Sequence, residues 1–371
     1  PEVIALDLTG LAVDAVSLDG RDVEFELAEG QLRIARPADR NAGELTLDIR
    51  YHGTPDDGLI VRNTLHGRPA VFADNWPNRT RFWLPTVDHP SDKATVRFTV
   101  HAPEAWEVVA NGAVAATESD AQRTRVRFEE TEPISTYLFS FVTGEFFVEV
   151  AQRDGREFRM FHREPDATLV ARNRDAIFDL HASAPAWLEK YTGIPYPFGK
   201  FDFLADPSFQ FSGMEHPGAI LYSAERLLLE ESATQNQMLG RASVVAHETA
   251  HMWFGNLVTM RWFDDVWMKE VFASFMAAKI VNPSFPDVNH DLRFLLANYP
   301  AAYGVDRTAG AHPIRQPLSN LDDAGQLYGA IIYQKAPIAM RQLEMIVGEQ
   351  AFRVFVMRLS VSVVHSTMSL A

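Results

Sequence analysis

Hydrophobic and polar residues alternate along several short stretches in the first 160 residues of the chain. The alternation is clearest at residues 23–27, 45–51 and 94–100. A period of two places one face of a strand toward a core and the other toward water. Gly, Asn, Asp and Pro residues separate these stretches, as is typical of turns. We therefore predict an N-terminal β domain, either a sandwich or an open sheet, whose last strand covers residues 136–146.

The spacing of apolar residues changes from a strand period to a helical period near residue 161. It predicts a helix over residues 166–192, short strands at 202–205 and 219–222, and helices at 233–254, 265–281 and 325–348. We therefore expect two domains, a β domain at residues 1–161 and a mainly helical domain at residues 162–371.

Length, charge and cysteine content restrict what the chain can be. Its 371 residues exceed one ordinary core, and 47% of them are hydrophobic, which indicates a globular protein. The net charge of −15 disfavours binding to nucleic acid or to an anionic membrane. No cysteine is present, which excludes disulfides, thiolate metal sites and a cysteine nucleophile.

No run of residues has the length and apolar character of a membrane span. The most apolar stretch, residues 354–364, is interrupted by Arg358. The sequence starts at Pro1 without a signal-like segment, so we expect a processed or cut soluble protein. This pattern leaves open a cytoplasmic or an exported location, and it leaves the oligomeric state open.

The motif with the clearest chemistry runs from His247 to His251 and has the form H-E-x-x-H. Residues four apart differ by about 40° around a helix, so both imidazoles project from one face and can share one ion. Glu248 lies beside that face, where it can accept a proton from water. A zinc site needs a third protein ligand and an open position, and Glu270 on the next predicted helix is the candidate.

The segment 247–278 closely resembles the aminopeptidase N family of gluzincin zinc metallopeptidases, which includes the leukotriene hydrolase. The family pattern places a glutamate after eighteen further residues and then F-A, as Glu270, Phe272 and Ala273 stand here. Thermolysin-type endopeptidases usually leave nineteen. The resemblance implies one zinc ion per chain, held by His247, His251 and Glu270.

Two further motifs extend the resemblance into the substrate site. Gly213, Met214 and Glu215 resemble the family's G-x-M-E-N exopeptidase signature, which implies that Glu215 anchors the substrate's free α-amino group. Tyr333, which follows Glu270 by 63 residues, begins a Y-x-K stretch like the one that carries the family's catalytic tyrosine. The resemblance thus implies that Glu248 is the catalytic base and that Tyr333 donates a hydrogen bond to the oxyanion.

The resemblance covers most of the chain, including residues 81–90 and 136–144. It implies a saddle-like β domain, lacking its first strands here, and a thermolysin-like catalytic domain. The family's C-terminal helical domain is expected to be absent, leaving an exposed apolar face on helices at 325–364. Candidates for that face are Phe352, Phe355 and Met357.

Several positions depart from the family pattern or leave the assignment of a role open. His216, Val271 and Pro337 stand at departures next to the three motifs. The residue that assists amine binding falls within residues 74–76. Met214, Phe209 and Phe211 are candidates for the specificity pocket. Either Asp264 or Asp265 is a candidate for orienting a metal-bound histidine.

The sequence therefore predicts a zinc-dependent aminopeptidase that acts on peptides with a free N-terminus. Three alternatives stay open: an epoxide hydrolase or bifunctional enzyme like the leukotriene hydrolase, an inactive zinc-stabilised binding module, and a thermolysin-like endopeptidase. The preferred N-terminal residue is not predicted.

Overall fold

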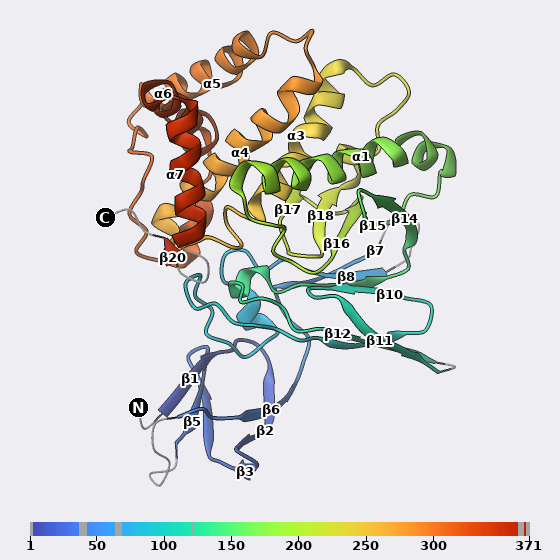
Figure 1. The fold of residues 1–371 in the computed structure, drawn as a ribbon. Coiled ribbons are helices and arrows are strands. Elements are labelled where there is room, and N and C mark those ends of the chain that lie inside the picture. The colour runs from blue at the N-terminus through green and yellow to red at the C-terminus, as the bar shows by residue number, and fades with distance from the viewer. Residues whose placement is uncertain (1–2, 37–42, 64–68, 121, 363–366, 369–371) are drawn as a thin grey trace.

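A computed structural model describes residues 3–36, 43–63, 69–120, 122–362 and 367–368. The first residues form two small antiparallel sheets at the bottom of Figure 1. One sheet has the strand order β1 (Val3–Asp7), β5 (Gln31–Ala35), β4 (Phe25–Ala28); the other has the order β3 (Arg21–Asp22), β2 (Ala12–Leu18), β6 (Leu47–His52). Their shared core contains Leu8, Leu11, Val16, Leu32 and Ile34.

Two further sheets complete the β-rich part of the chain. The first has the order β10 (Glu107–Ala110), β13 (Phe141–Gly144), β8 (Pro69–Ala73), β7 (Leu59–Asn63). The second has the order β11 (Val114–Ser119), β12 (Arg123–Phe128), β9 (Thr99–Pro103). This part lies directly beneath the helical part, so its upper loops can reach the site described below (Figure 1).

A five-stranded mixed sheet opens the second half of the chain. Its order is β14 (Phe147–Arg153), β15 (Arg156–His162), β16 (Phe201–Asp206), β18 (Ile220–Ser223), β17 (Gly213–Met214). β15, β16 and β18 run parallel, whereas β14 and β17 are antiparallel to their neighbours. Because strands on both sides of residue 161 share this sheet, the boundary placed there stays a prediction.

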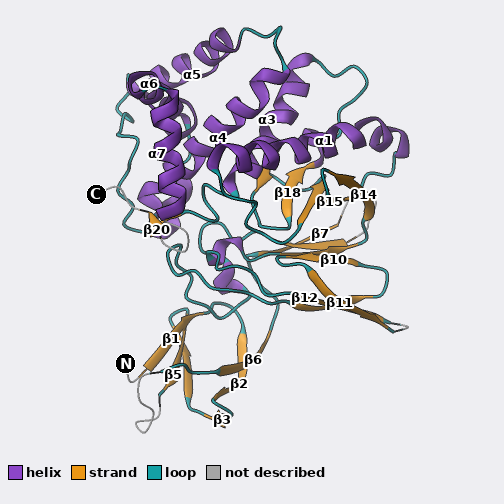
Figure 2. Ribbon diagram, in the orientation of Figure 1, coloured by secondary structure: helices purple, strands orange, loops and turns teal. Residues whose placement is uncertain are grey.

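Helix α1 (Ala167–Thr192) crosses above this sheet, and helix α3 (Gln235–His251) packs against both α1 and α4 (Val266–Val281) (Figure 2). Asp166 caps the start of α1, and a capping box of Thr234 and Gln237 starts α3. The N-terminus of α3 is therefore set by these local hydrogen bonds. The orientation of its apolar face is set by packing against α1 and α4.

One short helix, α2 (Ala224–Leu227), precedes α3. After α4 come helices α5 (His290–Asp306), α6 (Ala336–Val347) and α7 (Glu349–Ser362), with a π-helical turn η6 (Ile331–Lys335) before α6. Two short strands, β19 (Thr259–Met260) and β20 (Thr367–Met368), pair in parallel. Among the described residues, no helix combines the length and apolar character needed to cross a membrane.

Most predicted elements are present, with three corrections. Residues 136–146 form a 3-10 turn, η2 (Thr136–Leu138), and only then strand β13. The single helix predicted at 325–348 is a 3-10 turn η5 (Leu321–Leu327), the turn η6 and helix α6, because glycines at 325 and 329 interrupt it. Strand β9 begins only at Thr99, so most of the stretch 94–100 is outside a strand.

The predicted exposed face near the C-terminal helices is correct for Phe355 and wrong for Phe352. Phe355 is 51% exposed, whereas Phe352 is 1% exposed and packs against the ring of Phe275. Met357 has intermediate exposure. Other apolar side chains on α5 and α6 are more exposed than these, and Ile346 reaches 82%.

Candidate active site

The three predicted metal ligands converge at the facing sides of α3 and α4. Nε2 of His247 lies 3.0 Å from Nε2 of His251. Oε2 of Glu270 lies 3.3 Å from the first nitrogen and 3.7 Å from the second. The one-turn spacing within α3 aligns the two imidazoles, and the packing of α4 against α3 supplies the carboxylate.

Each imidazole is also held through its other nitrogen. Nδ1 of His251 lies 3.0 Å from the carbonyl oxygen of Phe254, and Nδ1 of His247 lies 3.3 Å from the hydroxyl of Ser274. Such contacts fix which nitrogen is available to a metal. The expectation that Asp264 or Asp265 plays this part is wrong: both carboxylates pair with Arg315 instead.

These donor atoms fit a zinc ion. Two imidazole nitrogens and one carboxylate oxygen are a donor set that zinc takes in peptidases, with a further position left for water or substrate. The three side chains line one cavity of about 770 Å³. Residue type, mutual distance and access therefore agree with the sequence prediction.

Glu248 lies in the same cavity, buried to 5% exposure. Its carboxylate rests against the backbone of Gly213 on β17, where there is no space for a Cβ atom. Burial raises the pKa of Glu248 to about 8, and the nearby His247 partly opposes that rise. A buried carboxyl with a raised pKa is suited to accepting and returning a proton near neutral pH.

Glu215 reaches the cavity from the loop after β17. Its Oε1 accepts a hydrogen bond from Nζ of Lys269 at 2.5 Å, and its backbone oxygen accepts one from Asn256. Burial raises the pKa of Glu215, but the charges of Lys269 and His251 outweigh burial and lower it to about 2. Glu215 is therefore ionised and is held in place from two sides.

His216, one of the departures from the family pattern, follows Glu215 directly in the chain and is not among the residues that line the cavity. His216 is fully buried, and neither ring nitrogen has a hydrogen-bond partner among the described residues. Burial lowers its pKa to about 4, although the charge of Glu215 opposes this shift. His216 is therefore a neutral, buried side chain.

Tyr333 enters the cavity from the π-helical turn η6 and is 37% exposed. The ring of Tyr328 lies 5.9 Å from its ring and is itself packed edge-on against Trp76. Burial, with a smaller contribution from the charge of Glu270, raises the pKa of Tyr333 above its ordinary value. The hydroxyl therefore keeps its proton and is a hydrogen-bond donor at the cavity.

Of the remaining predicted residues, some line the cavity and one is buried in the hydrophobic core. Met214, Phe211 and Asp74 line the cavity, whereas Phe209 is buried behind it against the rings of Phe72 and Phe211. Asp74 is 2% exposed and lies near Gln210 and Arg79. Burial raises the pKa of Asp74, which makes it a weaker anion than a surface aspartate.

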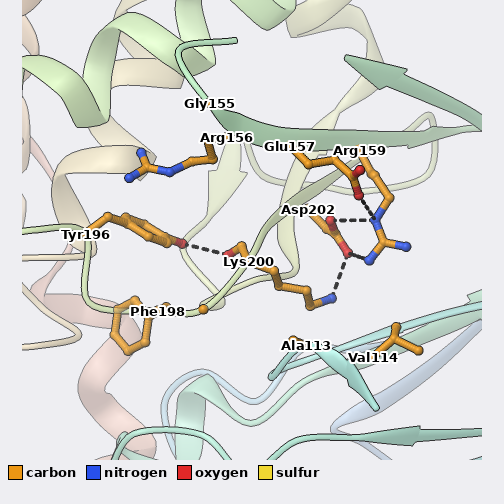
Figure 3. A pocket seen from close by; sticks show the side chains of 11 residues that line it. Ala113, Val114, Gly155, Arg156, Glu157, Arg159, Tyr196, Phe198, Lys200 and Asp202 are labelled. Atoms are coloured by element: carbon orange, nitrogen blue, oxygen red, sulfur yellow. Dashed lines mark hydrogen bonds and ion pairs between the residues drawn. The ribbon is translucent and has the colours of Figure 1, made fainter. Parts of the chain in front are cut away.

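A second cavity, of about 520 Å³, lies between β11 and the N-terminal ends of β15 and β16 in the mixed sheet (Figure 3). Three cations line it, and each has a carboxylate partner. Asp202 accepts hydrogen bonds from Arg159 and Lys200, and Arg156 pairs with Glu189. This cavity therefore has an internally balanced ion-pair network, and we assign no ligand to it.

Comparisons with known proteins agree with the geometry. The model of the Peptidase family M1 domain matches residues 178–363, and that of the Peptidase M1 N-terminal domain matches residues 2–138. The chain belongs to peptidase family M1. The two M1 regions correspond to the β-rich first part and the later, mainly helical part of the fold, as the sequence predicted.

Curated relatives of this M1 chain carry aminopeptidase names. It is 30% identical over 367 residues to the leucyl aminopeptidase of Saccharolobus solfataricus, covering 95% of this chain and 44% of that protein. It is 32% identical over 322 residues to aminopeptidase M1-A of Oryza sativa subsp. japonica, covering 84% of this chain and 36% of that protein. The M1 chain thus spans less than half the length of these relatives.

The structure also brings in residues that the motifs did not assign. Lys269 lies between Glu215 and Glu270, and Trp76 and Tyr328 line the same cavity. The sequence carried a weak signal for Lys269, since it is adjacent to the predicted ligand Glu270. Trp76 falls within the stretch 74–76 that was singled out for amine binding, but its indole contacts an enzyme cation instead.

Proposed function

We propose that this M1 chain is a zinc-dependent aminopeptidase that removes N-terminal residues from peptides. The observation that carries the proposal is the arrangement within one cavity. His247, His251 and Glu270 converge on one point, and Glu248 and Glu215 lie beside them. The aminopeptidase names of the relatives agree with this reading.

His247, His251 and Glu270 would hold the zinc ion. Zinc bound there supplies a Lewis acid that polarises the scissile carbonyl and lowers the pKa of water. The contacts of His251 Nδ1 with the carbonyl oxygen of Phe254 and of His247 Nδ1 with the hydroxyl of Ser274 keep Nε2 of each ring facing the shared point. The protein therefore presents its ligands in the required tautomers before a metal arrives.

Glu248 serves as the general base. It accepts a proton from the attacking water and passes that proton to the nitrogen of the leaving amine. The protein isolates this carboxylate from bulk solvent, which raises its pKa and makes it a better acceptor for the proton of water. Proton transfer of this kind typically contributes about 10²–10⁴-fold to the rate.

Glu215 binds the substrate's α-ammonium group. A carboxylate fixed beside the reacting centre admits one residue between the chain terminus and the bond that breaks, which gives exopeptidase action. Asn256 holds the backbone of Glu215, so this distance is set by the fold and not by a mobile side chain alone. Met214 and Phe211 form part of the wall that faces the first side chain of the substrate.

Tyr333 donates a hydrogen bond to the oxygen that becomes negative when water adds to the carbonyl. Its hydroxyl remains protonated because the pKa is raised. One such donor is typically worth about 2.7–4 kcal/mol. The ring of Tyr328 lies beside that of Tyr333, with the two centroids 5.9 Å apart.

Metal removal and restoration test this proposal. The chain is dialysed against a chelator, and hydrolysis of a leucyl arylamide is measured before dialysis, after dialysis and after addition of equimolar zinc. We expect activity to vanish with the metal and to return with it. Equal hydrolysis by the metal-free chain would show that the three converging ligands are not needed, and the proposal would then be wrong.

A further inference from the structure

Arg226 is a cation of the active-site cavity that the proposed chemistry does not use. It lies on α2, its side chain is exposed, and it lines the same cavity as the metal-binding residues. The other lysine and arginine side chains that line this cavity have carboxylate partners: Arg79 pairs with two aspartates, and Lys269 pairs with two glutamates. No residue in the described part of the chain forms an ion pair with Arg226. Its guanidinium is therefore free to take an anionic group of a substrate.

Strand β17 fixes the position of α2 relative to the catalytic groups. The strand is at the edge of the mixed sheet, and Glu215 follows its C-terminal end. Gly213, at its other end, rests against the carboxylate of Glu248. One residue earlier, the carbonyl oxygen of Ser212 accepts a hydrogen bond from the backbone N–H of Ser223, which directly precedes α2. The order along the strand is therefore the amine-binding carboxylate, the catalytic base and then the start of α2.

Helix α3 independently gives the same order. On the N-terminal side of the metal ligand His247, the residues of α3 that line the cavity are Gly240, Ser243 and Val244. They share one face of the helix, so the cavity follows α3 away from the metal ligands. Nη1 of Arg241 donates a hydrogen bond to the carbonyl oxygen of Leu227 at 3.3 Å. Because Leu227 adjoins Arg226, α2 meets α3 at the end of this face that is distant from the metal ligands.

The length of this face limits which part of a substrate can reach Arg226. Gly240 precedes His247 by seven residues, which is about 10 Å along a helix. An extended peptide covers about 3.3–3.6 Å per residue, so this distance corresponds to about three residues. A substrate with its N-terminus at Glu215 has its first peptide bond at the metal site and its later residues toward Arg226. The C-terminal carboxylate of a peptide of about three or four residues therefore arrives at this guanidinium.

We propose that Arg226 binds the C-terminal carboxylate of short substrates, so that the enzyme prefers tripeptides and tetrapeptides with a free C-terminus. A guanidinium offers two parallel N–H donors to the two oxygens of a carboxylate. This inference rests on the proposed function, because it takes the substrate amine at Glu215 as its starting point. Arg226 acts on the binding of short peptides and takes no part in bond breaking.

The other charges of the protein oppose the binding of a carboxylate. The chain has a net charge of −15, so its general field favours an amide C-terminus over an acid. Asp322 also lines the cavity, but it comes from η5, which packs against η3 (Phe263–Asp265), and it forms no ion pair with Arg226. A preference for the acid therefore requires a local cation, and Arg226 is the cation without a partner among the described residues of the cavity.

The test uses a tripeptide and a heptapeptide that begin with leucine and continue with glycine, each as the C-terminal acid and as the C-terminal amide. Release of leucine by the zinc-loaded chain gives kcat/KM for all four peptides. An exposed ion pair contributes up to about fivefold in affinity, and a bidentate pair contributes more. We expect the tripeptide acid to be preferred over its amide at least about fivefold, and less at high salt. The heptapeptide should show no such preference, because its carboxylate lies beyond Arg226.

Arg226→Gln removes the charge at an exposed position, where substitutions have little effect on stability. We expect the preference for the tripeptide acid to disappear, with kcat/KM for the amide unchanged. Arg226→Lys keeps a charge but loses the paired donors, so it should retain part of the preference. Arg172→Gln is the matched control, because Arg172 is an exposed arginine on α1 that pairs with Glu230 and Glu231 and does not line the cavity. This control should keep the wild-type preference.

The outcomes separate this inference from the function beneath it. Equal kcat/KM for the tripeptide acid and amide in the wild type overturns the inference. An unchanged preference in Arg226→Gln also overturns it: if Arg226 only shaped the cavity, acid and amide would be slowed alike and their ratio would stay the same. Both results leave the aminopeptidase function intact, because leucine is still released. A zinc-loaded chain that releases leucine from none of the four peptides contradicts the proposed function itself, and the inference then fails with it.

Discussion

Replacing Glu248 by Gln separates metal binding from chemistry. The carboxylate is 5% exposed and rests against the backbone of Gly213, so an amide of the same shape fits the same space. The three ligating atoms of His247, His251 and Glu270 lie within 3.7 Å of one another without any atom of Glu248. We therefore expect Glu248→Gln to keep its zinc.

The same substitution removes the proton acceptor. An amide cannot take a proton from water, so the whole contribution of general base catalysis is lost. That contribution is about 10²–10⁴-fold, which corresponds to about 2.7–5.5 kcal/mol in the activation barrier. The raised pKa of Glu248 indicates that its basicity is tuned for this transfer, and we expect a loss in kcat of at least about 10²-fold.

The assay combines metal analysis with turnover of a leucyl arylamide at saturating concentration. Glu225→Gln is the control, because Glu225 is an exposed glutamate on α2 and is not among the residues that line the cavity. We expect this control to match the wild type in zinc content and kcat. A zinc-loaded Glu248→Gln with wild-type turnover would place the base elsewhere, and loss of zinc would make Glu248 a ligand.

Three further predictions follow from particular contacts. Glu270→Ala removes one of three ligands, and we expect zinc content after dialysis to fall well below that of the wild type; full occupancy would refute the assignment. Tyr333→Phe should lower kcat by about 10²–10³-fold with zinc retained, and unchanged kcat would exclude Tyr333 as the donor. Burial lowers the pKa of His181 to about 3, so the unfolded chain binds more protons below pH 6.5. Stability should therefore fall below about pH 6.5 by up to about 1.4 kcal/mol per pH unit, and urea unfolding of His181→Phe should show a shallower dependence. An equal pH dependence of the free energy of unfolding in the wild type and in His181→Phe would show that His181 does not cause this loss of stability.

The convergence of the metal-binding residues was the easiest feature to predict from sequence. Two histidines one helical turn apart must face the same way, so His247 and His251 needed only a helix. Glu270 needed in addition that α4 pack against α3, which family spacing implied and apolar patterning alone did not. The contacts at Nδ1 of the two histidines were missed because their partners are a backbone oxygen and a serine hydroxyl, not the carboxylates at 264 and 265.

Helix α5 and the contacts of Lys269 were not predicted, for two different reasons. Helix α5 contains Pro300 and has one buried residue, Ala302, so it shows no clear apolar stripe. Lys269 was missed because its contacts are with Glu215, Trp76 and Tyr137, which come from distant parts of the chain. Helical spacing cannot reveal such contacts, since they arise only when the two parts of the fold meet.

The most direct test of the central claim is to identify the products that the zinc-loaded chain makes from a short unblocked peptide and from its N-acetylated copy. We expect single amino acids to be released one after another from the free N-terminus, with the acetylated copy cleaved more slowly. Internal fragments without released N-terminal amino acids, or faster cleavage of the acetylated copy, would contradict the account and indicate an endopeptidase at the same metal site.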